Sequence, residues 1–160
     1  SLNCKGIVTG ILLANGEIDQ IRCAELIELA KPIPVAFHRA FDMSNDLKKA
    51  LEDLIKLGFV RVLTSGACNS AFNGIETIAK LVKQANGRIE IMPGAGINSN
   101  NIQEIAATTG AKSFHSSARI SVESKMEYRN QTTKMGNIDD EYRYERTSVE
   151  LVKQMVEKLK

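Results

Sequence analysis

The feature that most constrains the fold is a repeat in which a short β-rich run is followed by a segment with helical spacing. Such runs occur at "KGIVTGIL", "IPVAFH", "VRVLTS", "RIEIMP" and "KSFHSS". Successive strands that are separated by helices need crossover connections, so the repeat predicts parallel strands. Runs as apolar as "IEIM" are typical of strands buried on both faces. The sequence therefore predicts an α/β fold built on a parallel sheet.

The segments between the runs carry the signals of helices. Ser44, Asn45 and Asp46 are candidate N-caps for a helix whose apolar positions follow the helical period. Glycines stand shortly before the third, fourth and fifth runs, where a residue without a Cβ readily ends a helix: Gly58, Gly87 and Gly110. Helical spacing returns at the C-terminal end of the sequence, through Val149, Val152, Met155, Val156 and Leu159.

Polar clusters follow four successive runs, each at the carboxyl end. They are Arg39 with Asp42, Thr64 with Ser65, Gly94 with Gly96, and the stretch from His115 to Arg119. A (β/α)8 barrel builds its active face from these ends, whereas an open doubly wound sheet binds ligands mainly at its switch point. Groups from four successive strands therefore favour the TIM-type barrel.

The number of runs leaves this barrel incomplete. A complete barrel takes eight strands and about 250 residues, whereas five runs and a C-terminal helix fit into this sequence. We expect an N-terminally incomplete barrel in which the runs are strands 4 to 8. Residues 1–160 are expected to form one domain. Within it, the polar and turn-rich segment 120–146 is expected to be a loop that caps the barrel mouth or reaches a neighbouring subunit.

Composition excludes several classes of function. A hydrophobic fraction of 43%, a charged fraction of 25% and a net charge of +2 are ordinary for a soluble globular protein. No block of like charge suggests nucleic-acid binding, no apolar run approaches the ~20 residues that span a bilayer, and no secretion signal is visible. We therefore expect a cytoplasmic protein with no nucleic-acid partner and no membrane partner.

The cysteines point to a reducing compartment. Cys4, Cys23 and Cys68 are odd in number, widely spaced and form no CxxC pair. This argues against a disulfide framework and against a structural zinc site, and it favours free thiols. Thiolates brought together by folding could still hold Cu(I), a soft metal ion.

Two segments predict an anion site. In "IMPGAGINSNN" a strand leads through Gly94 and Gly96 into a helix, an arrangement in which backbone N–H groups and the helix dipole cradle an anion. The alternative is a glycine-rich turn needed only for backbone geometry. In "FHSSAR" Arg119 could clamp a phosphate or carboxylate, or it could pair with an acidic neighbour on the surface.

Candidate acid–base groups lie in "FHRAFD" and "FHSSAR". His38 and His115 could move a proton or bind a metal, with Asp42 orienting one of them, or they could be satisfied by hydrogen bonds within the fold. Thr64 and Ser65 of "LTSG" are useful as hydrogen-bonding groups, but no GxSxG signature marks a nucleophilic serine. Whether the protein is an enzyme stays open.

The ordered segments "GIVTGILLANGEID", "VAFHRAFDM", "RVLTSG", "MPGAGI", "FHSSAR" and "MEYRNQ", followed by "DDEY", resemble the CutC family of copper homeostasis proteins. The resemblance implies a TIM-type barrel, a role in cytoplasmic copper homeostasis with Cu(I) as the bound ion, and a homo-oligomer, a dimer or a tetramer. It begins at the family's fourth strand. The residues that match the family pattern and face the site are His38, Arg39, Asp42, Thr64, Ser65, Gly66, Gly94, Gly96, His115, Ser116 and Ser117, and Cys68 could face it too.

Three functions are compatible with these observations. The first is a copper homeostasis protein of the CutC type that binds Cu(I). The second is an enzyme or sensor for a phosphorylated or carboxylated metabolite, because the matching groups are hard donors and anion binders and not sulfur ligands. In that case Gly94, Gly96 and Arg119 hold the anion while His38 or His115 moves a proton. The third is a structural or interaction role.

Overall fold

The computed structural model describes residues 4–133, 135 and 140–160. The chain forms two compact units, Ser1–Ser116 and Ser117–Lys160. None of the helices in the described part of the chain combines the length and apolarity that crossing a bilayer requires.

The first unit is a parallel sheet whose strands stand in sequence order. The strands are β1 (Ile7–Thr9), β2 (Val35–Phe37), β3 (Arg61–Thr64) and β4 (Glu90–Pro93), and each pairs in parallel with the next. The connecting helices are α1 (Gln20–Ala30), α2 (Leu47–Leu57), α3 (Ile75–Ala85) and α4 (Ile102–Thr109), with a 3₁₀ helix, η1 (Arg39–Met43), directly after β2. The predicted α/β fold with a parallel sheet is confirmed, and closure into a barrel stays a prediction.

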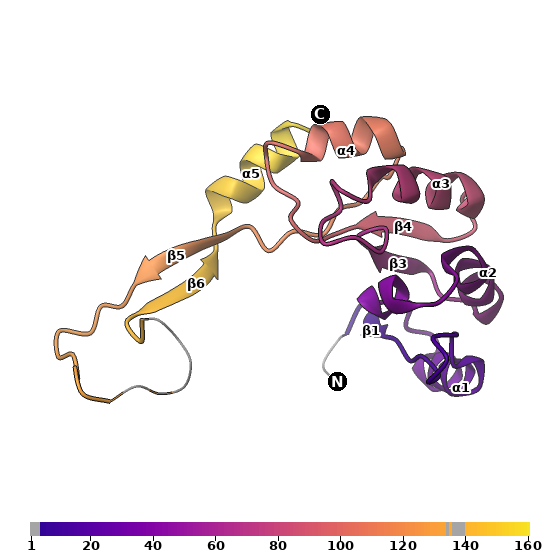
Figure 1. Cartoon of the computed structure of the whole chain (residues 1–160), viewed down its shortest axis with the longest axis horizontal. Coiled ribbons are helices and arrows are strands. Elements are labelled where there is room, and N and C mark those ends of the chain that lie inside the picture. The colour runs from indigo at the N-terminus through magenta and orange to yellow at the C-terminus, as the bar shows by residue number, and fades with distance from the viewer. Residues whose placement is uncertain (1–3, 134, 136–139) are drawn as a thin grey trace. The chain divides into compact units, whose positions relative to one another are not determined.

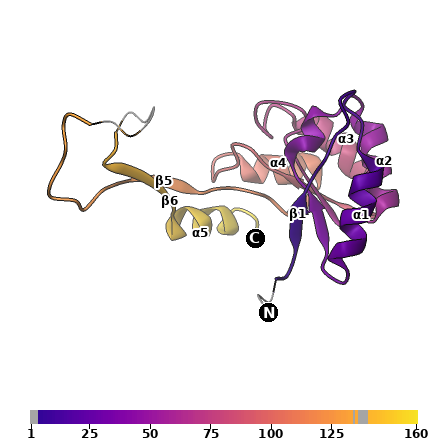
Figure 2. The same ribbon diagram turned by 90° about the horizontal axis from the view of Figure 1, so that it is seen from below.

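The hydrophobic core lies between the sheet and the helices. In both views α1, α2 and α3 lie on the same side of the sheet (Figure 1, Figure 2). Phe37 and Val62, which are register partners on that face, are fully buried, and so are Leu51 and Leu54 of α2. The opposite face is more open, and Val8 on it is 65% exposed.

Helix α2 shows how the sequence signals act locally. The Asp46 carboxylate accepts hydrogen bonds from the backbone N–H groups of Lys48 and Lys49, at 2.9 and 3.0 Å. At the other end Gly58 ends the helix with φ +88°, a conformation that a residue without a Cβ adopts freely. Gly110 ends α4 in the same way, whereas α3 ends at Asn86, one residue before the expected Gly87.

The predicted fifth strand is reduced to a single bridge. Within "KSFHSS" only His115 pairs, in parallel with Gly94, and its N–H donates to the Pro93 carbonyl at 2.8 Å. Among the described residues this run therefore pairs only at the end of β4.

The second unit differs from the loop expected over 120–146. It contains strands β5 (Arg119–Glu123) and β6 (Arg143–Thr147), paired antiparallel, followed by α5 (Val149–Glu157). The two strands stand near the two ends of the expected loop, because a polar stretch can also form a ribbon whose two faces are largely exposed. Most of their side chains are exposed, so the polarity itself agrees with the sequence analysis. Residues 134 and 136–139 of the predicted cap lie outside the described residues.

Candidate functional site

The candidate site lies along the carboxyl edge of the four-stranded sheet. All four strands are parallel, so the segments that follow them leave from one edge. Residues after β2 (His38 to Asp42), β3 (Ser65 to Cys68) and β4 (Gly94 to Ile97) therefore stand in a row, and His115 adds to the row through its bridge to Gly94.

Asp42 is the centre of the contacts in this row. Its side chain is 5% exposed and forms an ion pair with Arg39 at 2.8 Å. Its carboxylate accepts hydrogen bonds from the Thr64 hydroxyl, from the Ser65 N–H at 3.0 Å and from the Ala67 N–H at 3.1 Å. Asp42 therefore fixes η1 to the loop that follows β3.

These hydrogen bonds also decide the charge of Asp42. Burial alone would raise the pKa of the Asp42 carboxyl, but the hydrogen bonds that it accepts, chiefly from Thr64 and Arg39, outweigh burial and hold its pKa below the ordinary value. An ionised carboxylate with this many donors is suited to positioning its neighbours. A general base would need a pKa closer to neutral pH.

Arg39 is held in place and is open to solvent at the same time. Its Nε donates to Asp42 and its Nη2 donates to the Ser65 Oγ, both at 2.8 Å. The side chain remains 45% exposed, and Nη1 has no hydrogen bond to any described residue. The geometry presents a fixed guanidinium group, with one free edge, at the carboxyl end of the sheet.

Ser65 joins Arg39 to the following loop. Its hydroxyl lies 2.5 Å from the Cys68 carbonyl oxygen and 3.0 Å from the Asp42 carboxylate, and it accepts the hydrogen bond from Arg39. A hydroxyl has one hydrogen to donate, so the nearer acceptor, the Cys68 carbonyl, is the better partner. Ser65 is buried, and this set of contacts gives it a positioning role.

His38 begins η1 and packs against the end of β1. Its Nδ1 accepts a hydrogen bond from the Ala40 N–H at 3.1 Å, which in the neutral imidazole places the proton on Nε2. A Cβ at Gly10 would lie 2.8 Å from this imidazole, so the absence of a side chain at Gly10 allows the close approach. Gly10 is not among the residues predicted from the sequence; a glycine directly after a strand is the signal that could have identified it.

His115 shares the edge with His38 without being adjacent to it. The strand order puts three inter-strand steps between them, on the order of 14 Å. His115 is exposed, and its Cβ would lie 3.2 Å from a Cβ added at Gly94. Both histidines lie at the carboxyl end of the sheet. Joint action on one small molecule stays a prediction.

The glycine loop after β4 is held by its own side chains. The Gly96 carbonyl accepts hydrogen bonds from the amide groups of Asn101 at 2.8 Å and Asn98 at 3.1 Å. The Gly94 N–H donates a hydrogen bond to the Thr64 carbonyl at 2.9 Å. A Cβ added at Gly94 would lie 2.5 Å from the Leu63 side chain. These contacts show why glycine stands at position 94, and an anion site at this loop stays a prediction.

The remaining predicted site residues are divided between the two units. In the first unit Gly66 adopts φ +70° and donates its N–H to Thr64, while the Ser116 hydroxyl donates to the Ile97 carbonyl at 2.7 Å. In the second unit the Ser117 carbonyl accepts from Thr147, and Arg119 forms an ion pair with Glu145 at 2.8 Å. A shared role for Arg119 and the first unit stays a prediction.

The three cysteine thiols are free and lie in different environments. Cys23 is fully buried, and burial raises the pKa of its thiol; Cys4 is exposed and Cys68 is half-buried. In the residues that the structure describes, no three His, Cys, Asp or Glu side chains are close enough together to hold a metal ion. Cys68 is the cysteine on the carboxyl edge, where its carbonyl accepts from Ser65.

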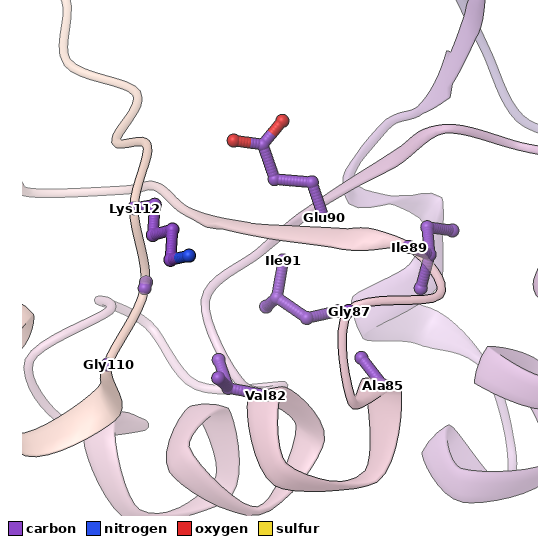
Figure 3. A pocket seen from close by; sticks show the side chains of 9 residues that line it. Val82, Ala85, Gly87, Ile89, Glu90, Ile91, Gly110 and Lys112 are labelled. Carbon is purple, nitrogen blue, oxygen red and sulfur yellow. The ribbon is translucent and has the colours of Figure 1, made fainter.

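A cavity of about 330 Å³ lies at the opposite end of β4. It is lined by residues of α3, of β4 with the turn before it, and of the segment after α4, among them Val82, Ile89 and Ile91 (Figure 3). Figure 3 shows the Glu90 carboxylate on the other side of the strand from Ile91. The walls of this cavity are mostly apolar, and none of the predicted site residues lines it.

Known proteins with similar sequences share one family. The sequence profile of the CutC family matches residues 1–120. A family protein CutC from Parabacteroides distasonis is 51% identical over 154 residues, which are 95% of this chain and 63% of that protein. A copper homeostasis protein cutC homolog from Mus musculus is 50% identical over 131 residues, 82% of this chain and 48% of the mouse protein.

Structural similarity agrees with the sequence comparison. The crystal structure of the putative copper homeostasis protein CutC from Streptococcus agalactiae superposes with a TM-score of 0.68 at 39% identity, covering 71% of this chain and 56% of that one. The chain thus spans between about half and two-thirds of the length of these relatives. At this identity and coverage, the chain belongs to the CutC family.

Proposed function

We propose that the chain is part of a copper homeostasis protein whose working site is the carboxyl edge of the parallel sheet. The names of the mouse and human relatives support copper homeostasis. The arrangement of the first unit supports a partial (β/α)8 barrel, because its strands follow one another in sequence order and α1, α2 and α3 lie on one side. Val8, Leu63 and Met92 on the open face would then point into the barrel.

The ligand that this edge fits best is a small anionic molecule that carries a phosphate or carboxylate group. The observation that carries this proposal is the guanidinium of Arg39, which is fixed by Asp42 and Ser65 and keeps one edge free. Fixing the guanidinium before the ligand arrives lowers the entropy lost on binding. The hydroxyl and imidazole groups of the same edge would orient the ligand.

Binding of inorganic phosphate, a sugar phosphate and citrate, measured by calorimetry, tests this proposal. Arg39→Lys should weaken binding roughly tenfold, because lysine cannot reproduce the fork geometry of the guanidinium. Arg88→Lys is the matched control, since Arg88 is also 45% exposed and also pairs with a carboxylate, that of Glu52. Equal affinity of the Arg39→Lys variant and the unchanged chain, or no binding of any of the three anions, would contradict the proposal.

Direct binding of Cu(I) is a second candidate, favoured by the position of Cys68 on the same edge. A thiolate is the ligand type that Cu(I) prefers. Competition for Cu(I) against a chromophoric chelator should then give stoichiometric binding that Cys68→Ser weakens, whereas Cys23→Ser, in the buried core, leaves the affinity unchanged. Binding that is unaffected by Cys68→Ser would remove this candidate.

A further inference from the structure

The sequence contains three Asn-Gly pairs: Asn15 with Gly16, Asn73 with Gly74, and Asn86 with Gly87. An asparagine in such a pair is prone to deamidation, in which the glycine nitrogen attacks the carbon of the side-chain amide. Glycine favours this reaction because it has no Cβ to hinder the approach of its nitrogen. In a folded chain the approach also requires that the backbone and the side chain are free to turn. The three pairs have the same local chemistry, so the fold determines which of them reacts.

The first pair is held by hydrogen bonds of both its side chain and its backbone. The Asn15 side chain donates to the Glu17 carboxylate and accepts from the Glu17 N–H, both at 3.0 Å. The Gly16 N–H donates to the Leu13 carbonyl at 2.9 Å, and the Asn15 carbonyl accepts from the Asn45 side chain at 2.8 Å. Attack by the Gly16 nitrogen on the Asn15 side chain would break these bonds, so the fold protects this pair.

The second pair is held by packing and by Ser70. Gly74 is buried, and its N–H donates to the Ser70 carbonyl at 3.1 Å. The Asn73 N–H donates to the Ser70 hydroxyl at 3.2 Å. A Cβ added at Gly74 would clash with the Ser65 carbonyl oxygen, so the backbone at Gly74 packs closely against the loop after β3. The backbone of this pair therefore has little room to turn.

The third pair is exposed, and the peptide group that joins its two residues makes no hydrogen bond. Asn86 follows the last residue of α3, and Gly87 lies in the turn between α3 and β4 (Figure 3). Both residues are exposed, and a Cβ added at Gly87 would have no atom within 4 Å. Among the residues that the structure describes, neither the Asn86 carbonyl, the Asn86 side-chain amide nor the Gly87 N–H has a hydrogen-bond partner. This peptide group can therefore rotate without breaking a hydrogen bond.

We propose that Asn86 is a site of spontaneous deamidation in the folded chain. Hydroxide removes the proton from the Gly87 nitrogen, and this nitrogen attacks the Asn86 Cγ. The new bond closes a succinimide ring, and the bond from Cγ to the side-chain nitrogen breaks, so that this nitrogen leaves as ammonia after taking a proton from water. Water then opens the ring at one of its two carbonyl carbons, which gives aspartate or isoaspartate. Water and hydroxide are the only co-reactants.

The reaction changes the C-terminal end of α3. The new carboxylate lies at the end of the helix where the macrodipole disfavours negative charge. Isoaspartate also inserts a methylene group into the backbone directly before Gly87, which lines the cavity of Figure 3. The modification therefore acts at the end of β4 opposite to the carboxyl edge, and the inference does not depend on which ligand that edge binds.

Peptide mapping by mass spectrometry tests the proposal on the unchanged chain, incubated at mildly alkaline pH with and without urea. In the folded chain Asn86 should deamidate at least about tenfold faster than Asn15 and Asn73, because these two are held away from the reactive geometry. In urea the three asparagines should react at similar rates, since only the local sequence then acts. The comparison is made within one chain, so it does not depend on the folding of any variant.

Labelling of isoaspartate by a protein isoaspartyl methyltransferase gives a second measurement. Asn86→Gly removes the reacting amide and keeps a residue that adopts the left-handed conformation seen at position 86, where φ is +45°, so it should reduce the labelling of the aged folded chain to near background. Asn73→Ala is the matched control and should leave the labelling unchanged. The proposal would be overturned if Asn15 or Asn73 deamidated as fast as Asn86 in the folded chain. It would also be overturned if Asn86 stayed intact in the folded chain while all three asparagines reacted in urea.

Discussion

Asp42 is the residue on which the candidate site depends most. It is buried, ionised and bonded to the loop after β3, and it holds the guanidinium of Arg39. The partners of this buried carboxylate include a cation and several N–H and O–H donors. Removing the carboxylate alone is costly, because these partners are then left without an acceptor.

The change Asp42→Asn should lower the free energy of unfolding by about 3 kcal/mol. It removes the negative charge, and it replaces one acceptor oxygen by an amide N–H group that faces only other donors. Urea denaturation measures this loss. Asp46→Asn is the control, because asparagine caps a helix about as well as aspartate, and it should change stability by less than about 0.5 kcal/mol. Equal effects of the two changes would mean that Asp42 has no special structural role.

The stability conferred by Asp42 should also depend on pH. Its folded pKa is below the unfolded value of about 3.9, so the contribution is fully present above that value and is lost as the pH falls through the folded pKa. The difference in unfolding free energy between the unchanged chain and Asp42→Asn should therefore shrink as the pH falls from about 6 to about 3. A difference that stays constant over this range would show that the charge of Asp42 is not what stabilises the site.

At the scale of elements, the helices and the first four strands are where the sequence was most informative. Apolar spacing predicts α2; Asp46, one of three candidate N-caps, begins the helix, and Gly58 ends it as expected. Strands β5 and β6 were not predicted. Most of their residues are exposed, so the strands need no continuous apolar face, and the short alternation of polar and apolar residues in "RISVE" is hard to tell from a polar loop.

Packing of α2 against the sheet should account for much of the stability of the first unit. Leu54 is fully buried, so Leu54→Ala should lower the free energy of unfolding by about 2 to 5 kcal/mol. Leu29, on α1, is 83% exposed, and Leu29→Ala should have little effect in the same thermal or urea denaturation. A loss of comparable size at both positions would contradict the assignment of the core to the interface between α2 and the sheet.

At the scale of the whole molecule, the sequence predicted which residues lie along one edge but not how they contact each other. The parallel order of the strands follows from the strand–helix repeat, and it brings Arg39, Ser65 and Gly94 to one end of the sheet. The contacts of Asp42 with Thr64 and Ala67 come from loop geometry, which depends on packing between units of the repeat and leaves no local signal.

The open face of the sheet holds another arrangement that the sequence did not reveal. Arg61 and Glu90 form an ion pair there across β3 and β4, with side chains 41% and 34% exposed. Each of these charged residues is the first residue of an apolar strand. The local sequence does not show which residue of the neighbouring strand will pair with it. The register of the sheet decides this contact, and register is a property of the assembled fold.

Amide chemical shifts of the isotopically labelled chain, followed during titration with inorganic phosphate, show which residues the bound anion contacts. We expect shifts concentrated at the carboxyl edge, at Ser65, Ala67 and Gly96, and little change at Gly87 and Gly110 at the opposite end. Shifts confined to the cavity of Figure 3, or spread evenly over the surface, would contradict it.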